Sequence, residues 1–103
     1  MTIEDFKKTV EGTIPAGLSK YLQALWHDRV GDWNKAHEVS QEIHDSAGYW
    51  IHAYLHRKEG DYANAGYWYI RAEKELPDYS LEQEWTELVL KFLEMENKKS
   101  GTT

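Results

Sequence analysis

The sequence contains no cysteine among its 103 residues. Without a thiol the chain cannot form a disulfide bond, a thiolate metal site or a cysteine nucleophile. This absence is typical of proteins that work in a reducing compartment. The N-terminal segment, which includes Glu4 and Asp5, also lacks the apolar stretch of a secretory signal. We therefore expect a cytoplasmic protein.

Long apolar runs and an excess of positive charge are also missing. No stretch of about 18 apolar residues occurs, so no segment is expected to cross a membrane. The 12 Lys and Arg residues are outnumbered by 18 Asp and Glu residues, which gives a formal net charge of −6. Domains that bind nucleic acid are usually basic, because their affinity comes largely from neutralising phosphates. Nucleic acids and membranes are therefore not expected as partners.

Aromatic residues are abundant in spite of the polar overall composition. Five Trp, seven Tyr and two Phe make up 14% of the chain, and each ring buries a large area when it enters a core. The length is that of one domain. We therefore expect a single folded domain over residues 1–103, although the mean hydropathy is only −0.77.

An internal repeat is the dominant pattern, and it consists of residues 24–36 and residues 53–65 aligned in register. A Gly-Asp pair lies in the second half of each copy. Glycine directly after a helix tolerates the left-handed backbone that closes it, which suits Gly31 and Gly60. Asp32 and Asp61 then stand where a side chain caps the next helix. Each copy is therefore predicted to be a helix, a tight turn and an antiparallel helix.

These residues resemble the tetratricopeptide repeat, a helical hairpin that stacks into arrays. The resemblance covers roughly residues 18–77 and implies two repeat-like units, over residues 18–46 and 47–77. The copies are closer together than the family's usual spacing of about 34 residues. His52 and His56 also occupy interior positions of the first helix where the family normally has Leu and Tyr. A segment spanning residues 52–71 is also similar to uncharacterised bacterial proteins of unknown function, which implies no activity. The residues that carry the family resemblance in the second unit are Tyr49, Ala53, Gly60, Asp61, Tyr62, Ala65, Tyr69, Ala72 and Pro77.

The whole chain is predicted to be an all-α array of about six helices. The last helix carries an apolar stripe at helical spacing, so it is expected to cap the open end of the array. Residues 97–103 are expected to form a frayed tail. The predicted helices cover residues 3–11, 15–30, 33–45, 47–59, 62–75 and 81–96.

Four histidines are spaced so that they can share helix faces. His52 and His56 are four residues apart and therefore face one side of a helix. His37 and His44 do the same on the preceding helix, which is expected to pack antiparallel to theirs. Neutral imidazoles suit zinc and other transition metals. The alternative is that His52 and His56 are core residues that hydrogen-bond to their neighbours. The carboxylates available to complete a metal shell are Glu38, Glu42 and Glu59.

Aromatic residues provide a second candidate site. In the tetratricopeptide family a groove lined by the first helices binds peptides, and the resemblance implies such a groove here. Tyr67 and Trp68 are further candidates for binding, because large rings dominate binding hot spots; the alternative for both is packing against the last helix. The predicted groove residues are Tyr21, Trp50, Tyr54 and Arg57.

We therefore predict a non-enzymatic interaction module that binds a protein or peptide and needs no cofactor. A pocket lined by the four histidines, for a transition metal such as zinc or for a small molecule, is the alternative. An enzymatic use of that pocket would rest on His56 as a general base near Glu59 and Asn64. No nucleophile motif or phosphate-binding loop in the sequence supports catalysis. Exposed rings on a short array are also compatible with a homodimer.

Overall fold

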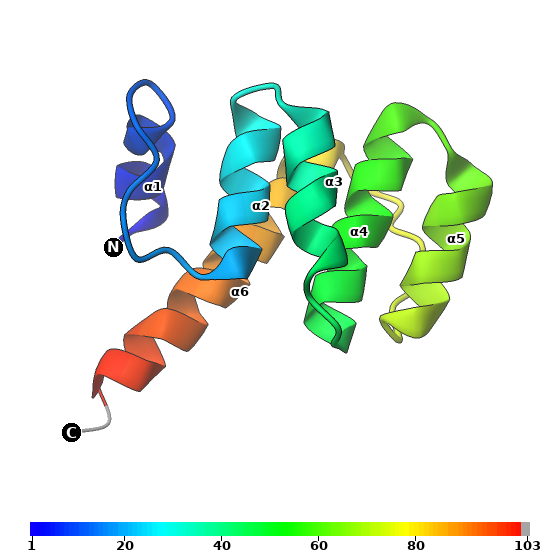
Figure 1. Ribbon diagram of the computed structural model, residues 1–103. Coiled ribbons are helices and arrows are strands. Elements are labelled where there is room, and N and C mark those ends of the chain that lie inside the picture. Colours follow the sequence, from blue (N-terminus) through cyan, green and yellow to red (C-terminus); the bar gives the residue numbers. More distant parts are fainter. Residues whose placement is uncertain (102–103) are drawn as a thin grey trace.

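The computed structural model describes the backbone of residues 1–101 and the side chains of residues 1–98, and Figure 1 shows its arrangement. The described chain contains helices and no strand, which confirms the predicted all-α class. The helices are α1 (Ile3–Thr9), α2 (Lys20–Arg29), α3 (Trp33–Gln41), α4 (Ser46–Glu59), α5 (Tyr62–Arg71) and α6 (Leu81–Gly101).

Helices α2 and α3 form one antiparallel pair, and α4 and α5 form a second pair beside it (Figure 1). Each pair turns at a glycine with left-handed backbone, Gly31 at φ 93° and Gly60 at φ 88°. The Asp32 and Asp61 side chains each accept a hydrogen bond from the backbone N–H three residues later, and so cap α3 and α5. The bends predicted at the two Gly-Asp pairs are therefore confirmed.

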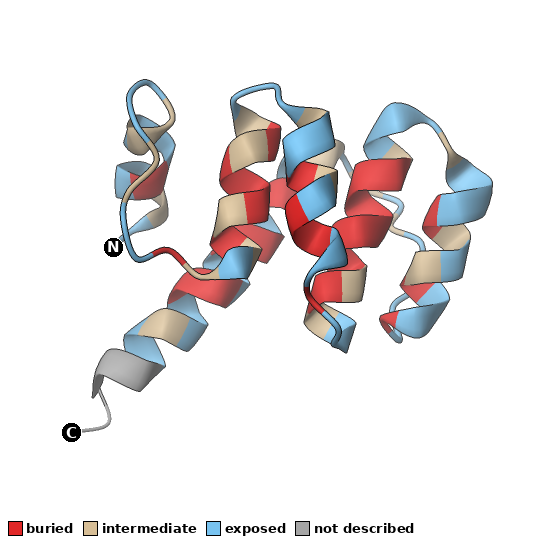
Figure 2. Cartoon of the chain, viewed as in Figure 1, coloured by how far each residue is buried: buried red, intermediate tan, exposed pale blue. Residues whose placement is uncertain are grey.

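A single apolar core connects the two pairs, and α4 lies at its centre. Most residues of α4 between Trp50 and His56 are buried, whereas α5 has an exposed outer side (Figure 2). Ala36 of α3 and Ala65 of α5 are fully buried, as close approach of two helices requires. Each pair thus presents its first helix, α2 or α4, to the same side of the molecule.

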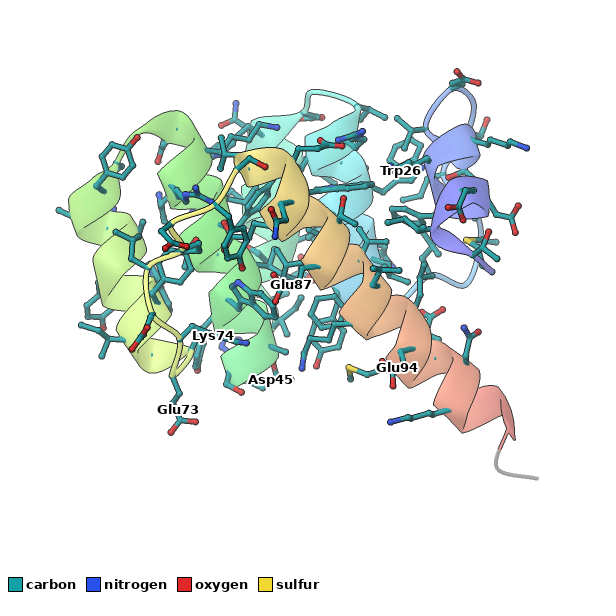
Figure 3. All side chains as sticks on the ribbon, turned by 180° about the vertical axis from the view of Figure 1, so that it is seen from behind. Trp26, Asp45, Glu73, Lys74, Glu87 and Glu94 are labelled. Carbon is teal, nitrogen blue, oxygen red and sulfur yellow. The ribbon has the colours of Figure 1, made fainter. Side chains whose placement is uncertain are left out.

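Helix α6 crosses that side, as Figure 3 shows from behind. Its stripe of Trp85, Leu88 and Phe92 is fully or almost fully buried and packs over α2 and α4. The helix that was predicted to cap the array therefore covers its first helices and leaves the outer side of α5 open. Covering two helices at once buries more apolar area than covering the single helix α5 would.

Several helix ends differ from the sequence prediction. Helix α2 begins at Lys20 and not at residue 15, because the Ser19 side chain caps it and Gly17 takes a left-handed φ of 82°. Helix α5 stops at Arg71, since Glu73 takes a left-handed φ of 58°. Helices α1 and α3 also end before the predicted positions.

The C-terminal end differs in the opposite direction. Residues 97–101, which were predicted to fray, continue helix α6. Residues 102–103 of the predicted tail lie outside the described part of the chain. Within the part that is described, no helix has both the length and the apolar character that crossing a bilayer requires.

Candidate metal centre

Three of the four predicted histidines converge where α3 packs against α4. His37 extends from α3, and His52 and His56 extend from successive turns of α4. His52 Nε2 lies 3.0 Å from His37 Nε2 and also 3.0 Å from His56 Nε2. One ligand atom from each residue lies within 4.8 Å of the other two. The three imidazoles therefore direct nitrogens toward one another.

Two tryptophans hold the imidazole rings in place. The Trp33 ring stacks on His37 with centroids 4.8 Å apart, and the Trp68 ring stacks on His52 with centroids 4.0 Å apart. Trp33 Nε1 also donates a hydrogen bond to the Leu55 carbonyl at 2.8 Å, which ties the start of α3 to α4. The packing leaves His52 only 5% exposed, whereas His37 is half-buried. His37 is therefore the most exposed of the three clustered histidines.

Glu59 defines the protonation of His56. Its Oε2 atom lies 2.7 Å from His56 Nδ1, one helical turn away on α4. A carboxylate only accepts hydrogen bonds, so we infer that Nδ1 carries the proton. In the neutral ring, Nε2 then presents a lone pair toward the other two histidines. Imidazoles that bind metals commonly have such a carboxylate behind them, because it orients the ring and raises its basicity.

The two short contacts of His52 Nε2 cannot both be ordinary hydrogen bonds. A ring nitrogen has one in-plane position, which holds either a lone pair or a proton. With His56 Nε2 as an acceptor, a proton on His52 Nε2 can point to His56 or to His37, but not to both. The cluster therefore has more convergent nitrogens than hydrogen bonding among its three rings can satisfy.

Burial favours the neutral form of His37 and His52. Loss of water around His52, together with the smaller electrostatic effects of His37, His56 and Arg71, lowers its pKa to about 3. The same loss of water lowers the pKa of His37 below its ordinary value. Neutral imidazole is the form that binds a metal ion. In that form each of these two rings has one nitrogen with a free lone pair, so no positive charge has to be removed before a metal ion binds.

The fourth predicted histidine, His44, does not belong to the cluster, which corrects that part of the prediction. Helix α3 ends at Gln41, so His44 lies in the loop before α4 and is exposed. Of the predicted carboxylates only Glu59 lies at the cluster. Glu38 and Glu42 are exposed and paired with lysines elsewhere on the surface.

A second group near the cluster consists of His56, Glu59 and Asp61. Asp61 is already engaged as the cap of α5, where both of its oxygens accept hydrogen bonds from Asn64. Asn64, predicted to lie near His56 when that histidine acts as a general base, bonds instead to Asp61 in this cap. Glu59 is engaged with His56 Nδ1. This second group is therefore explained by helix capping and by orientation of His56.

The predicted peptide groove is closed in the structure. Trp50 and Tyr54 are only 4% and 2% exposed. Trp50 Nε1 and Arg57 Nη1 donate to the Glu84 carboxylate of α6 at 3.0 and 2.8 Å, and the Tyr54 hydroxyl donates to Asp28 at 2.7 Å. These side chains hold α6 and α2 against α4. An open groove at Trp50, Tyr54 and Arg57 is therefore wrong, because α6 fills the space.

The other predicted binding rings have different surroundings. Tyr21 stacks on Phe92 of α6 with centroids 4.5 Å apart, and its hydroxyl donates to Asp45. Trp68 packs on His52 of α4 and not on the last helix. Tyr67 is 55% exposed. Tyr67 is thus the predicted binding residue that remains open to solvent.

Sequence reasoning missed Trp33 and Arg71, which both border the histidines. Trp33 occupies the aromatic position after the Gly-Asp turn, and its place on the face of His37 follows from their four-residue spacing. Arg71 lies over the rings of Tyr49 and Trp68. No signal in the sequence separates Arg71 from the other arginines, since its neighbours come from two helices.

Comparison with known proteins adds no assignment. No family model, curated protein or solved structure matches the chain. The geometry of the histidine cluster is therefore the observation that bears on function.

Proposed function

We propose that the protein binds a divalent transition-metal ion of the zinc class through Nε2 of His37, His52 and His56. The observation that carries the proposal is the position of His52 Nε2, 3.0 Å from both of the other nitrogens. One cation between the three rings would use all three lone pairs, whereas protons satisfy only some of them.

The donor set favours zinc over calcium or magnesium. Imidazole suits zinc, copper and nickel, whereas the two hard cations take oxygen ligands. Zinc lies about 2.0–2.1 Å from imidazole nitrogen, which places the nitrogens of a tetrahedral site about 3.3 Å apart. The observed 3.0 Å contacts are close to that separation, so small ring rotations would accommodate the ion. Three protein ligands leave a fourth position free for water or another ligand.

Metal binding would join parts of the chain that are distant in sequence. His37 belongs to the first helix pair, and His52 and His56 belong to the second. An ion that binds only the folded chain raises the free energy of unfolding in proportion to the logarithm of its concentration over Kd. We therefore expect the metal to stabilise the packing of α3 on α4.

The test is a calorimetric titration of chelator-treated protein with ZnCl₂ and NiCl₂. We expect one ion per chain with a Kd below about 10 μM for zinc. The variant His37→Gln removes one ligand from the half-buried side of the cluster, where loss of the imidazole disturbs the core least. It should bind zinc at least about tenfold more weakly, which is a loss of about 1.4 kcal/mol.

The matched control is His44→Gln, because His44 is exposed and lies outside the cluster. It removes the same side chain and should keep wild-type zinc affinity. Circular dichroism of both variants checks that they fold. Wild-type binding weaker than about 10 μM, or equal losses in both variants, would refute the proposal.

The peptide-binding function predicted from the sequence is not part of this proposal. Its groove residues Trp50 and Tyr54 are buried beneath other helices, so they offer a peptide no open surface.

A further inference from the structure

A separate pocket borders His52, among the end of α3, the start of α4 and the end of α5. Its volume is about 270 Å³, just below the usual range of about 300–1,000 Å³ for small-molecule sites. His52 contributes to its wall, but His37 and His56 do not. Six of the lining residues are Ser40, Ile43, His44, Tyr49, Trp68 and Arg71.

Arg71 is the charged group of this pocket, and aromatic rings hold it. Its guanidinium carbon lies 4.5 Å from the centroid of Tyr49 and 4.8 Å from that of Trp68. A weak hydrogen bond of 3.5 Å joins Nη2 to the Tyr49 hydroxyl. Stacking occupies the flat faces of a guanidinium and leaves its N–H edges free to donate. The rings therefore orient the guanidinium of Arg71 and leave its N–H groups available to a ligand.

The other two arginines differ from Arg71 in having carboxylate partners. Arg29 pairs with Glu82, and Arg57 pairs with Glu84. Arg71 forms no ion pair with any residue whose side chain the structure describes. No Asp or Glu lines the pocket, although the protein as a whole carries a net charge of −6. The pocket is thus a locally cationic site on an acidic protein.

We propose that this pocket binds a small organic carboxylate. The carboxylate would accept hydrogen bonds from the edge of Arg71, a planar donor that matches both of its oxygens. The apolar body of the ligand would lie against the rings of Tyr49 and Trp68. A flat aromatic acid fits these walls best, since stacked or edge-on rings attract each other beyond simple burial.

This site is distinct from the proposed metal centre and does not depend on it. The pocket shares His52 with the metal centre, but its anion-binding group is Arg71 on α5. A chain that fails to bind zinc can still bind the carboxylate, and the reverse also holds. A negative result for zinc binding therefore does not refute carboxylate binding, and a negative result for carboxylate binding does not refute zinc binding.

The test is a calorimetric titration of the chelator-treated protein with benzoate, acetate and inorganic phosphate. We expect benzoate to bind with a Kd on the order of 1 mM or lower, as befits a ligand of this size. Acetate should bind at least about tenfold more weakly because it has no ring. In a two-dimensional NMR spectrum, benzoate should shift the indole signal of Trp68, assigned with Trp68→Phe.

The decisive variant is Arg71→Met, which keeps the length of the side chain and removes its charge. It should weaken benzoate binding at least about tenfold and leave zinc affinity unchanged. Lys74→Met is the matched control, because Lys74 follows α5 but lies over Trp50, outside the pocket. It should change benzoate affinity by less than about twofold.

Three results would overturn the proposal. One is equal benzoate binding by Arg71→Met and wild type. Another is phosphate binding as tight as that of benzoate, which would indicate a general anion site. The third is a benzoate titration of wild-type protein that leaves the Trp68 indole signal unmoved, a result that does not depend on whether Arg71→Met folds.

Discussion

Arg57 of α4 and Glu84 of α6 form an ion pair in which the carboxylate is completely buried. Arg57 Nη1 lies 2.8 Å from Glu84 Oε1, and Glu84 is 0% exposed. Trp50 Nε1 and the Tyr69 hydroxyl donate to the second oxygen at 3.0 and 2.6 Å. Arg57 also donates to the Tyr79 carbonyl before α6. Donors from α4 and α5 thus compensate one buried charge on α6, and this network fixes where α6 lies.

Replacing Glu84 by alanine should lower the free energy of unfolding by about 3–5 kcal/mol, because Arg57 would keep its charge without a partner. Urea unfolding followed by circular dichroism measures the change. The control is Glu82→Ala, on the same helix as Glu84. It removes a carboxylate from a more exposed ion pair with Arg29 of α2. That control should cost about 0–1 kcal/mol. Similar losses in the two variants would contradict the account of the buried network.

The same substitution should have opposite effects at two glycines. Gly48→Ala, in α4, places a methyl group 2.5 Å from the Ile43 side chain, so it should cost about 1–3 kcal/mol. Gly66→Ala, in the middle of α5, meets nothing within 4 Å and should stabilise the protein by about 0.5–1 kcal/mol. Thermal unfolding of both variants checks the signs. Stabilisation by Gly48→Ala would show that Ile43 does not pack closely against Gly48 of α4.

Glu73, labelled in Figure 3, is the described non-glycine residue with a left-handed backbone. It ends α5 in the way that Gly60 ends α4, since the next N–H bonds back to the Tyr69 carbonyl at 2.9 Å. Glu73→Gly should remove the strain and raise the free energy of unfolding by about 0.5–1 kcal/mol. The control Glu75→Gly, at a position without a positive φ, should be neutral or slightly destabilising. Urea unfolding distinguishes the two, and a loss of stability in Glu73→Gly would contradict the prediction.

The metal-free protein should lose stability as the pH falls below about 6.5. Burial lowers the pKa of His52 to about 3 when folded, whereas an unfolded histidine has a pKa of about 6.5. Between these values the unfolded chain binds a proton that folded His52 does not, so acid favours unfolding. Above pH 6.5 the titration of His52 costs no stability. Below pH 6.5 it lowers the free energy of unfolding by about 1.4 kcal/mol for each pH unit.

Urea unfolding between about pH 7.5 and 5.5, with a chelator present, measures this slope. His52→Gln removes the titrating group and should flatten the curve. The lowered pKa of His37 adds a second contribution of the same sign, so some slope should remain. A wild-type curve that is level across this range would contradict the buried neutral state of His52.

The sequence by itself determined the helix pairs and the placement of two of the three clustered histidines. Gly31 and Gly60 adopt a conformation that side chains resist, and the aspartates that follow cap the next helices, so each bend depends only on local residues. The four-residue spacing of His52 and His56 likewise places both on one helix face, because an α-helix has 3.6 residues per turn.

Tertiary structure alone decided which other residues lie beside His52 and His56. Periodicity allowed both His37 and His44, but α3 ends at Gln41, and of these two His37 is the one that joins His52 and His56. The apolar stripe of α6 predicted a buried helix without saying which surface it covers. That choice depends on the partners that Glu84 finds far away in the sequence, and a buried charge is stable only where such donors surround it. The sequence wrongly predicted an open peptide groove and gave no sign of the Arg71 pocket for the same reason. Both features depend on contacts between helices, which local sequence patterns do not contain.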